Sequence, residues 1–319
     1  MRASPTPARG NICRLPSENV RKDPGHALHR DVFVPIAMGI VTCLMRESDF
    51  EYIRTLVYER SRIHLDNRKR ELVAARLAKR LRETQTASVG DYCNLLRSPG
   101  QDEECSRLID AISTNHTFFF REASHFEFVR SRIVPEMSER ARRERWARLY
   151  AWSAACSSGE EPYSLAMALD DSVDRARWSW HVEATDISMR MLEVAQKAVY
   201  RSESVIEKTP AWAMHCFQRG IGPQEGNFRI KPSLHSRVTF RHLNLLEGSP
   251  PFPEPMHVIF CRNVMIYFDR ATQEELVAKL TRQLVPGGYL FVGHSESLAN
   301  ITHGLQLVES AIYRRPAAT

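Results

Sequence analysis

The spacing of apolar residues changes along the chain and divides it into a helical region and an α/β region. From Glu47 onward, apolar residues recur every three or four positions, which predicts helices over residues 47–61, 67–83, 88–97 and 102–113. From Ala147 onward, short apolar runs alternate with helix-spaced segments. These runs predict strands over residues 147–152, 181–186, 238–242, 256–261 and 289–293. The segments between them predict helices over residues 125–143, 163–169, 189–200 and 272–284.

This order of elements predicts an open α/β sheet with a helical domain before it. A chain of 319 residues is long enough for a large domain and a smaller one. We expect a helical N-terminal domain over residues 47–124 and an α/β domain over residues 125–319. Residues 202–235 are rich in turn formers and predict a small β insertion.

Residues 1–46 are predicted to be a disordered or non-core extension. The first 31 residues are rich in Pro, Arg and His, and residues 32–45 form an uncharged run broken by Pro35 and Gly39. That run is shorter than the roughly 20 residues that a membrane-spanning helix needs, and no cleavage site follows it clearly. We therefore expect neither membrane insertion nor secretion.

The amino-acid composition indicates the cellular compartment of the protein more clearly than its function. The chain is 43% hydrophobic and 26% charged, as is usual for globular proteins. Its seven cysteines are scattered without metal-ligand spacing, which favours reduced thiols in the cytoplasm and no metal site. A net charge of +6 indicates an acidic partner but leaves nucleic acid, membrane and protein open.

The chemistry centres on residues 152–164, where a strand leads through small residues into a helix. Such a turn brings a nucleotide-like ligand against backbone N–H groups. However, Gly159 is the only glycine in it, and Glu160 and Glu161 would repel a pyrophosphate. A ligand with positive charge and no phosphate fits better, and S-adenosylmethionine is such a ligand. The alternative is an ordinary helix start with acids placed favourably on the helix dipole.

The ends of the predicted strands carry further polar side chains. Asp186 ends the second strand, which is where α/β folds hold ribose hydroxyls. Because a ligand lies at the carboxyl edge of an open α/β sheet, we expect it to meet the side chains at successive strand ends. These are Glu161, Asp186, Asn244, Asn263 and His294.

Two segments of the helical region admit both a structural and a functional interpretation. The helix over residues 67–83 is strongly basic, with Arg68, Lys69, Arg70, Arg76, Lys79, Arg80 and Arg82. This is either a solvated face or a docking surface for an acidic helix. Residues 112–122 carry three consecutive phenylalanines beside Asn115, Thr117 and Arg121. They form either a buried linker or part of a ligand cleft between the domains.

With these motifs in hand, the chain resembles the CheR family of bacterial chemotaxis receptor methyltransferases from about Ser48 to Tyr313. Members of this family use S-adenosylmethionine to esterify glutamate side chains of chemoreceptors, leaving S-adenosylhomocysteine. The resemblance implies a doubly wound, Rossmann-like methyltransferase sheet with an N-terminal all-α domain and a small β subdomain. The segments that carry it are residues 114–122, 154–164, 184–188, 260–269 and 287–297.

The resemblance also implies a set of site residues. The cofactor-binding residues would be Asn115, Thr117, Arg121, Glu161, Asp186, Asn244, Leu245, Asn263 and Val264. Glu161 would bind the methionine ammonium and Asp186 the ribose. Residues 244–245 would flank the adenine, and residues 263–264 would lie beside the sulfur.

The chemistry implied by the resemblance needs no general base, because a glutamate side chain is already ionised at neutral pH. Arg121 would orient that carboxylate, and Tyr267 would shape the methyl-transfer end. The expected partners are the helical bundle of a chemoreceptor and a receptor tail peptide at the β insertion, bound by a cytoplasmic monomer. Three features depart from the family pattern: a long basic loop over residues 140–148, Cys156, and residues 1–46.

A nucleic-acid amino methyltransferase is the competing enzyme. Residues 249–252 read Ser-Pro-Pro-Phe, which resembles the signature of that class. That signature should follow the fourth strand, whereas here it precedes the strand over residues 256–261. We therefore interpret it as a turn and expect no nucleic-acid partner. A non-catalytic binding module is less favoured, because competent residue types fill every cofactor position.

Overall fold

The computed structural model describes residues 45–173, 178–248 and 250–317. Most of the predicted extension, residues 1–44, lies outside the described residues. The two that are described belong to the fold: Met45 is buried at 1% exposure, and Arg46 is the N-cap of helix α1 (Glu47–Ser61). Placing residues 45 and 46 outside the fold was therefore wrong, since burying a methionine side chain stabilises the domain. Among the described residues, no helix has the length and apolar character needed to cross a bilayer.

The helical domain contains α1, α2 (Arg70–Thr84), α3 (Val89–Arg97) and α4 (Asp102–Ile112), with a 3₁₀ turn, η1 (Asn67–Lys69), before α2. Asp66 and Ser88 cap the starts of η1 and α3, as their side chains accept backbone N–H groups three residues later. Ser48, a residue type that suits a helix cap, lies inside the first turn of α1. The helices pack around apolar side chains that include Phe50, Leu77 and Leu108.

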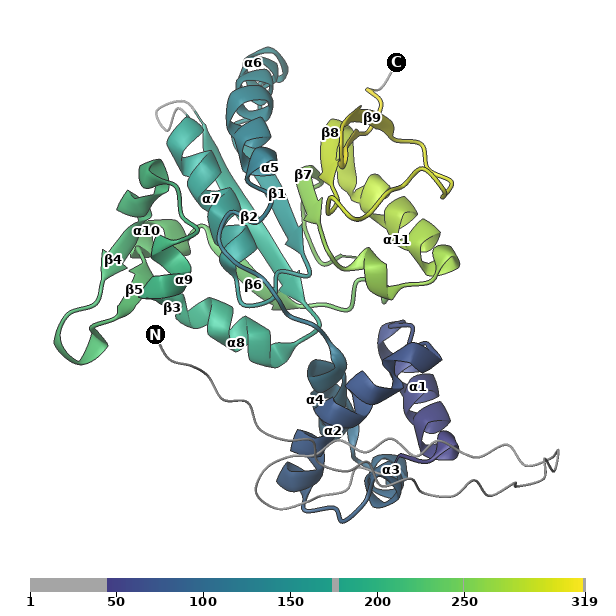
Figure 1. Ribbon diagram of the computed structural model, residues 1–319. Coiled ribbons are helices and arrows are strands. Elements are labelled where there is room, and N and C mark those ends of the chain that lie inside the picture. Colours follow the sequence, from purple (N-terminus) through teal and green to yellow (C-terminus); the bar gives the residue numbers. More distant parts are fainter. Residues whose placement is uncertain (1–44, 174–177, 249, 318–319) are drawn as a thin grey trace, which may run out of the picture. The chain divides into compact units, whose positions relative to one another are not determined.

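The α/β domain is a doubly wound sheet, as predicted (Figure 1). The described residues form a seven-stranded sheet in the order β6-β2-β1-β7-β8-β10-β9. Its parallel part consists of β6 (Val238–His242), β2 (Ser179–Asp186), β1 (Arg148–Ala154), β7 (Met256–Cys261) and β8 (Leu284–Phe291). Successive strands run outward from β1 in one direction and then from β7 in the other, so the strand order reverses between β1 and β7. Open α/β sheets bind ligands at such a point.

Two antiparallel strands at the sheet edge were not predicted: β10 (Ile312–Arg314) and β9 (Gln306–Glu309). All four residues of β9 are exposed, so this strand has no apolar alternation to detect. The predicted strand over residues 289–293 is also longer than expected. It begins at Leu284, and residues 286–288 lie within β8 and do not form a turn.

Side chains alternate along the strands and pack into separate cores on the two faces of the sheet. Ala151 and Val258 pack with α5 (Ala123–Phe128) and α7 (Glu160–Ser172). Trp152 and Ile259, the next residue along each strand, pack with α11 (Arg270–Gln283). Helix α8 (Met189–Lys197) is capped by Ser188, whose side chain accepts the N–H of Met191.

The predicted helix over residues 125–143 is three segments. Between α5 and α6 (Val134–Glu144), the π-helical turn η2 (Val129–Ile133) widens the helix. Pro135 follows at once, and proline has no N–H for the helical ladder and collides with the carbonyl four residues earlier. A wider turn there relieves that collision. Because α6 continues to Glu144, the long basic loop predicted over residues 140–148 is wrong.

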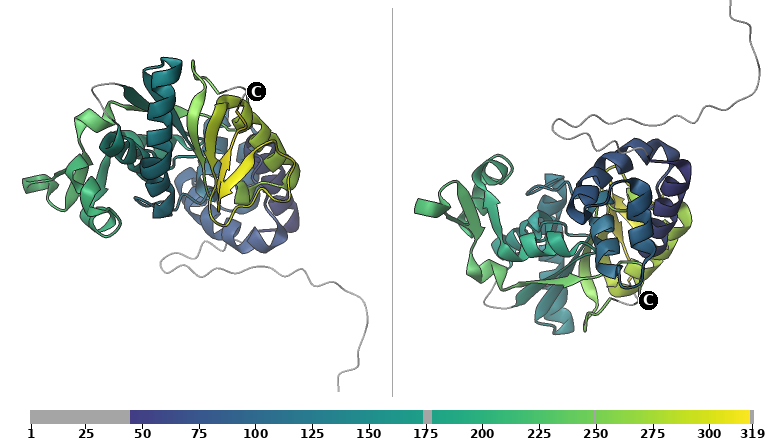
Figure 2. Two further views of the ribbon diagram at one scale, coloured as in Figure 1. Left: turned by 90° about the horizontal axis from the view of Figure 1, so that it is seen from above. Right: turned by 90° about the horizontal axis from the view of Figure 1, so that it is seen from below.

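The β insertion is a small antiparallel sheet beside α7 (Figure 1). Among the described residues its strand order is β3 (Val199–Arg201), β5 (Asn227–Ile230) and β4 (Phe217–Arg219). Short helices connect these strands: α9 (Ser202–Ile206), η3 (Ala211–Cys216), η4 (Gly222–Gln224) and α10 (Pro232–His235). The insertion starts earlier than predicted, because Ala198 adopts a left-handed conformation that ends α8. The further views in Figure 2 show the insertion and the strands β9 and β10 at opposite ends of the α/β domain.

Candidate cofactor and active site

One cavity brings together all ten of the predicted site residues. It lies where the carboxyl ends of β1, β2 and β7 meet the helical domain, and it encloses about 1050 Å³, counting the part open to solvent. The residues that line it include Asn115, Thr117, Arg121, Glu161, Asp186, Asn244, Leu245, Asn263, Val264 and Tyr267.

Of the five residues predicted at the strand ends, His294 is the one that does not line this cavity. Its ring lies against His125, with the centroids 4.7 Å apart. Its backbone N–H donates to Glu122 at 3.3 Å. His294 therefore positions Glu122 and does not itself contact the ligand space.

The turn between β1 and α7 is strained in a manner typical of ligand sites. Ala155 and Ser157 both adopt positive φ angles, of 64° and 49°. Gly159 has φ of 98°, and a Cβ there would lie 2.8 Å from both Ala195 Cβ and Tyr200 Oη. Only glycine fits at this position. The turn keeps the backbone close to the cavity, and strain of this kind points to function.

Asp186 is held in place by the same turn. Its carboxylate accepts the N–H of Ser157 and the N–H of Ser188, each at 2.8 Å. Burial raises the pKa of Asp186, although these two N–H groups oppose the shift. A carboxylate has about four lone-pair positions, so Asp186 can still accept hydrogen bonds from a diol in the cavity.

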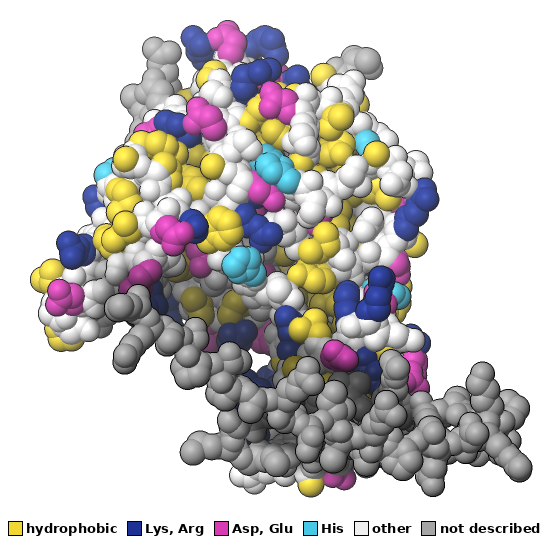
Figure 3. Space-filling model, viewed as in Figure 1, with side chains coloured by type: hydrophobic (Ala, Val, Ile, Leu, Met, Phe, Trp, Pro, Cys, Tyr) yellow, Lys and Arg dark blue, Asp and Glu magenta, His cyan; other side chains and the backbone are white. Residues whose placement is uncertain are grey.

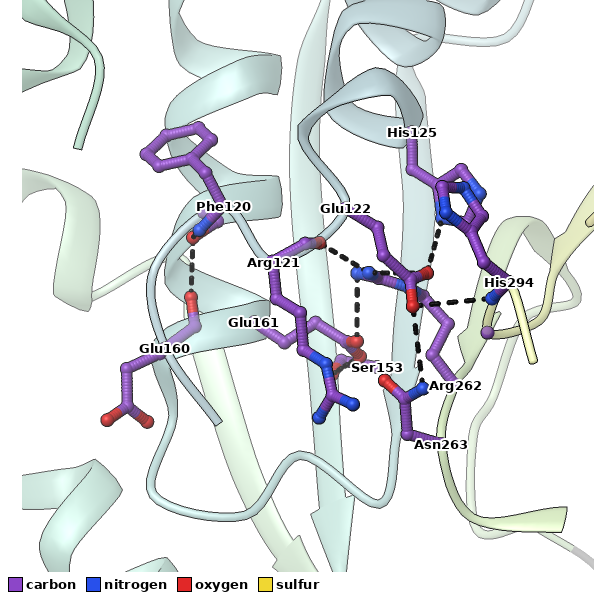
Figure 4. Close-up of polar contacts among 12 residues, drawn as sticks. Phe120, Arg121, Glu122, His125, Ser153, Glu160, Glu161, Arg262, Asn263 and His294 are labelled. Carbon is purple, nitrogen blue, oxygen red and sulfur yellow. Dashed lines mark hydrogen bonds and ion pairs between the residues drawn. The ribbon is translucent and has the colours of Figure 1, made fainter. Parts of the chain in front are cut away.

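Glu161 belongs to a buried charge cluster, which we call the Arg262 cluster and define as Arg262, Glu122 and Glu161 (Figure 4). Arg262 donates to Glu122 at 2.9 Å and to Glu161 at 3.3 Å. Ser153 Oγ also donates to Glu161, at 2.7 Å. Burial raises the pKa of Glu161, whereas Arg262 lowers the pKa of Glu122 despite its burial. Two carboxylates share one guanidinium, so a cationic ligand group would complete the neutralisation.

A further carboxylate, that of Glu296, shapes the loop after β7. Its oxygens accept the N–H groups of Asn263 at 2.7 Å, Met265 at 2.8 Å and Gly293 at 2.6 Å. These bonds hold Asn263 in a left-handed conformation, with φ of 59°. Asn263 and Val264 thereby line the cavity.

The helical domain closes the cavity through three contacts. Tyr58 Oη donates to Asp269 at 2.8 Å, and the His64 N–H donates to the carbonyl of Tyr267 at 2.8 Å. Asn244 Nδ2 donates to the carbonyl of Arg60 at 3.1 Å. Two predicted site residues, Asn244 and Tyr267, are thus positioned by the helical domain.

Comparison with known proteins decides the family. The description "CheR methyltransferase, all-alpha domain" matches residues 48–113, and "CheR methyltransferase, SAM binding domain" matches residues 115–314. The chain belongs to the CheR methyltransferase family.

Curated relatives agree over most of their length. The chemotaxis protein methyltransferase of Escherichia coli K12 is 40% identical over 84% of this chain and 91% of the relative. The Klebsiella aerogenes protein of that name is 41% identical over 84% and 90%. The one from Borreliella burgdorferi is 35% identical over 82% and 91%. Among solved structures, the glycopeptide N-methyltransferase MtfA with S-adenosylhomocysteine is 15% identical, with a TM-score of 0.29 over 49% of this chain and 47% of that one, too slight a likeness for argument.

The cavity suits the cofactor of the CheR family, S-adenosylmethionine. This cofactor carries an ammonium and a sulfonium, a ribose diol and a flat adenine. The Arg262 cluster offers an incompletely neutralised carboxylate for a cation, and Asp186 offers acceptors for a diol. Leu245 and Ile187 add apolar surface to the same cavity. The chemistry of the lining therefore fits the cationic groups, the ribose diol and the adenine of the cofactor.

Sequence reasoning missed three residues that organise the site: Glu122, Arg262 and Glu296. Glu122 and Arg262 lie inside the recognised motifs, next to Arg121 and Asn263. Position alone did not reveal them, because their roles depend on contacts between distant segments. A charged residue next to a predicted ligand residue was the signal available.

The basic face predicted on α2 is largely structural. Arg80 is 7% exposed and donates to Glu104 at 2.9 and 2.6 Å. Arg76 donates to carbonyl groups at the C-terminus of α4, including that of Ser113 at 2.9 Å, and helix ends otherwise leave such groups unpaired. A docking role for Arg80 was therefore a wrong prediction, because its side chain is buried in an ion pair inside the domain. Arg76 is half-buried and lines a surface groove, so its docking role stays a prediction.

A groove beside the cavity retains some of the expected positive charge. Lys79, Arg107 and Arg190 are exposed in it, together with Glu103 and Glu193. The groove shares the lining residues Ser113, Asn115 and Ile187 with the cofactor cavity, so the two are adjacent. Figure 3 shows the same mixing of basic and acidic side chains on the face in view.

Proposed function

We propose that this protein transfers the methyl group of S-adenosylmethionine to glutamate side chains of chemoreceptors, giving glutamate 5-O-methyl esters. The curated relatives are named chemotaxis protein methyltransferases. The observation that carries the substrate assignment is Arg121. It places a guanidinium in the cofactor cavity, where a substrate carboxylate can pair with it.

The cofactor would occupy the cavity along the sheet edge. Glu161 binds the methionine ammonium and Asp186 the ribose diol. Residues 244–245 flank the adenine, Asn115 and Thr117 line the opposite wall, and residues 263–264 lie beside the sulfur. When bound, S-adenosylmethionine supplies an electrophilic methyl group on a positively charged sulfur.

The protein's own contribution is alignment and exclusion of water. Glutamate is ionised at neutral pH, so its oxygen attacks without a general base. Arg121 orients that carboxylate; its Nη1 donates to the carbonyl of His116 at 2.8 Å, which anchors the side chain. Tyr267 shapes the methyl-transfer end, and its backbone is bonded to the helical domain. Such positioning accounts for a large part of the barrier reduction in two-substrate reactions.

Two surfaces would bind the receptor. The groove with Lys79, Arg107 and Arg190 lies next to the cavity, and its positive charges suit an acidic helical bundle. The β insertion suits a receptor tail peptide in extended form, because β3 and β4 are the outer strands of its sheet. Exposed Ile206 and Ile221, at 60% and 83%, offer apolar contacts there. The monomeric state remains a prediction.

The competing nucleic-acid methyltransferase is less well supported. Phe252, the aromatic residue of the Ser-Pro-Pro-Phe sequence, packs against Trp152 with ring centroids 5.0 Å apart. Trp152 belongs to the core on the α11 face of the sheet. Phe252 is thus engaged in packing, as expected for a turn.

The test is transfer of labelled methyl from S-adenosylmethionine to a purified receptor cytoplasmic domain, followed by treatment with base. Esters release methanol in base, whereas N-methyl groups do not. We expect base-labile label that disappears when the modifiable glutamates are changed to alanine. Base-stable label, or label retained without those glutamates, would refute the ester assignment.

A further inference from the structure

A second cluster of metal-ligand side chains lies away from the cofactor cavity. Asp170 is in the last turn of α7, and His215 and Cys216 end η3, just before β4 of the insertion. Their candidate ligand atoms, one from each residue, all lie within 4.8 Å of one another. The cysteine spacing in the sequence gave no sign of this, because the three ligands come from two distant segments.

The histidine is oriented as a metal ligand would be. His215 Nδ1 lies 2.7 Å from the carbonyl of Trp212. A carbonyl can only accept, so Nδ1 carries the proton and Nε2 presents its lone pair. Metal-binding histidines are commonly oriented by a bond of this kind through their other nitrogen.

The spacing of the two strongest ligands matches a zinc site. His215 Nε2 lies 3.5 Å from Cys216 Sγ. For Zn–S of about 2.3 Å and Zn–N of about 2.0–2.1 Å in tetrahedral geometry, the ligand atoms would be about 3.5–3.6 Å apart. The same distance also suits an S–H···N hydrogen bond, so the experiment must separate the two.

The surroundings make the cluster both rigid and accessible. Trp212, whose carbonyl holds the histidine, is itself fixed by Arg130 over its ring at 4.1 Å and by Phe120 at 5.4 Å. Cys216 is buried at 3% exposure, whereas His215 is exposed and Asp170 is half-buried. An ion can therefore enter from solvent and meet a thiol held in place.

We propose that Asp170, His215 and Cys216 form a zinc site that ties the β insertion to α7. Binding displaces the thiol proton of Cys216 to solvent, and the thiolate and the Asp170 carboxylate balance the 2+ charge. Zinc accepts this mixture of sulfur, nitrogen and oxygen ligands, and a water would complete the tetrahedron. Because the other end of α7 carries Glu160 and Glu161, the ion would join the insertion to the helix that lines the cofactor cavity. The proposal is independent of the methylated substrate.

Cobalt titration of the full chain tests the site, since Co²⁺ replaces Zn²⁺ and reports a thiolate ligand by a charge-transfer absorption. The starting protein carries Cys13→Ser and Cys43→Ser, which removes the thiols outside the described residues. We expect one Co²⁺ per chain with that absorption, and its loss when one equivalent of Zn²⁺ is added. Absence of the absorption would refute the site and leave the hydrogen bond.

Variants assign the ligands. Cys216→Ser should abolish the absorption, whereas Cys105→Ser, at a buried cysteine of the helical domain, should retain it. His215→Ala and Asp170→Asn should each weaken Zn²⁺ binding at least tenfold, while His64→Ala, at another exposed histidine, should not.

Zn²⁺ should also raise the melting temperature of the parent protein more than that of the Asp170→Asn variant. Unchanged affinity in both His215→Ala and Asp170→Asn would overturn the proposal even if Cys216→Ser fails to fold. Cobalt bound without a thiolate band would instead point to Glu122, His125 and His294.

Discussion

Each domain of this protein buries an arginine beside glutamates, but only the Arg262 cluster lines the cofactor cavity. In the helical domain, Arg80 donates to both oxygens of Glu104, which also accepts the hydroxyl of Tyr92 at 2.7 Å. In the α/β domain, Arg262 is shared between Glu122 and Glu161. The first cluster satisfies its carboxylate completely. The second holds Glu161 at a longer distance and leaves it facing the cavity.

This difference separates a structural charge from a functional one. A buried ion pair that contacts no ligand has a structural role. Removing one partner lowers stability strongly, because the other partner then remains as an unpaired buried charge. An open cluster leaves a carboxylate incompletely neutralised, which costs stability in the free protein and favours a cationic ligand. The raised pKa of Glu161, caused first by burial, is the sign of that state.

Breaking the closed cluster should have the largest effect. Arg80→Ala leaves Glu104 buried without its cation, which should lower the free energy of unfolding by about 3–5 kcal/mol. Urea denaturation measures this loss. Arg82→Ala, at an exposed position of the same helix, should change stability by less than about 0.5 kcal/mol. Equal small losses in both variants would make Arg80 a surface charge after all.

At the open site, Arg121→Ala should lower kcat by about tenfold to a hundredfold, because the substrate carboxylate loses its orienting partner. The KM for receptor should change much less, since docking involves other surfaces. Arg121→Lys should recover part of the rate. Near wild-type turnover in Arg121→Ala would mean that residues 114–122 act only as a linker.

Asp186→Ala should weaken S-adenosylhomocysteine binding at least tenfold. The variant loses acceptors for the ribose diol, and each charge-assisted bond contributes about 1.5–3 kcal/mol. Isothermal calorimetry gives the Kd, and a melting curve of the free protein controls for the lost bonds to Ser157 and Ser188. A folded variant with an unchanged Kd would place the ribose elsewhere.

Glu161→Gln should separate binding from stability. Burial raises the pKa of Glu161, so its contribution to stability is complete below its ordinary pKa and is lost as pH rises through the raised value. The cofactor-free variant should therefore be at least as stable as wild type at neutral pH, yet bind S-adenosylhomocysteine about tenfold more weakly. Wild-type affinity should fall as pH drops through the raised pKa, whereas the variant's affinity should not follow Glu161. A clear loss of stability in the variant would show that this cluster is as closed as that of Arg80.

The smallest effect is expected at the groove. Lys79→Glu should raise the KM for receptor a few-fold at low salt and leave cofactor affinity intact, because rim charges mainly affect association. The effect should fade at high salt, where the Debye length is about 3 Å at 1 M. A matched change, Arg68→Glu, alters a charge at η1 outside the groove lining. If the two variants have the same KM, the groove does not bind the receptor.

The sequence predicted which residues lie at the carboxyl edge of the sheet, because the ends of parallel strands lie side by side in this topology. Strands β6 and β7 have the predicted bounds, and the ten predicted residues line one cavity although they are far apart in the chain. What escaped prediction depends on pairing between distant segments. Arg262 and Glu122 are separated by 140 positions, and no local pattern joins them.

The sequence could have shown that Arg80 does not belong to the exposed basic face of α2. Arg80 follows Val73 and Leu77 at helical spacing, which places it toward the apolar face of α2 and not among the solvated charges. Its partner Glu104 lies on another helix, so its role as a buried ion pair needed the structure. Likewise, Pro135 indicates a break in the helix predicted over residues 125–143, but it does not show which residues form the π-helical turn.

A crystal structure of the complex with S-adenosylhomocysteine tests the central claim most directly. The account predicts the amino group of the ligand within hydrogen-bonding distance of Glu161 and both ribose hydroxyls on Asp186. The sulfur should lie beside Asn263, with the Arg80 cluster unchanged. A ligand whose amino group lies away from the Arg262 cluster, or whose ribose is held by residues other than Asp186, would contradict it.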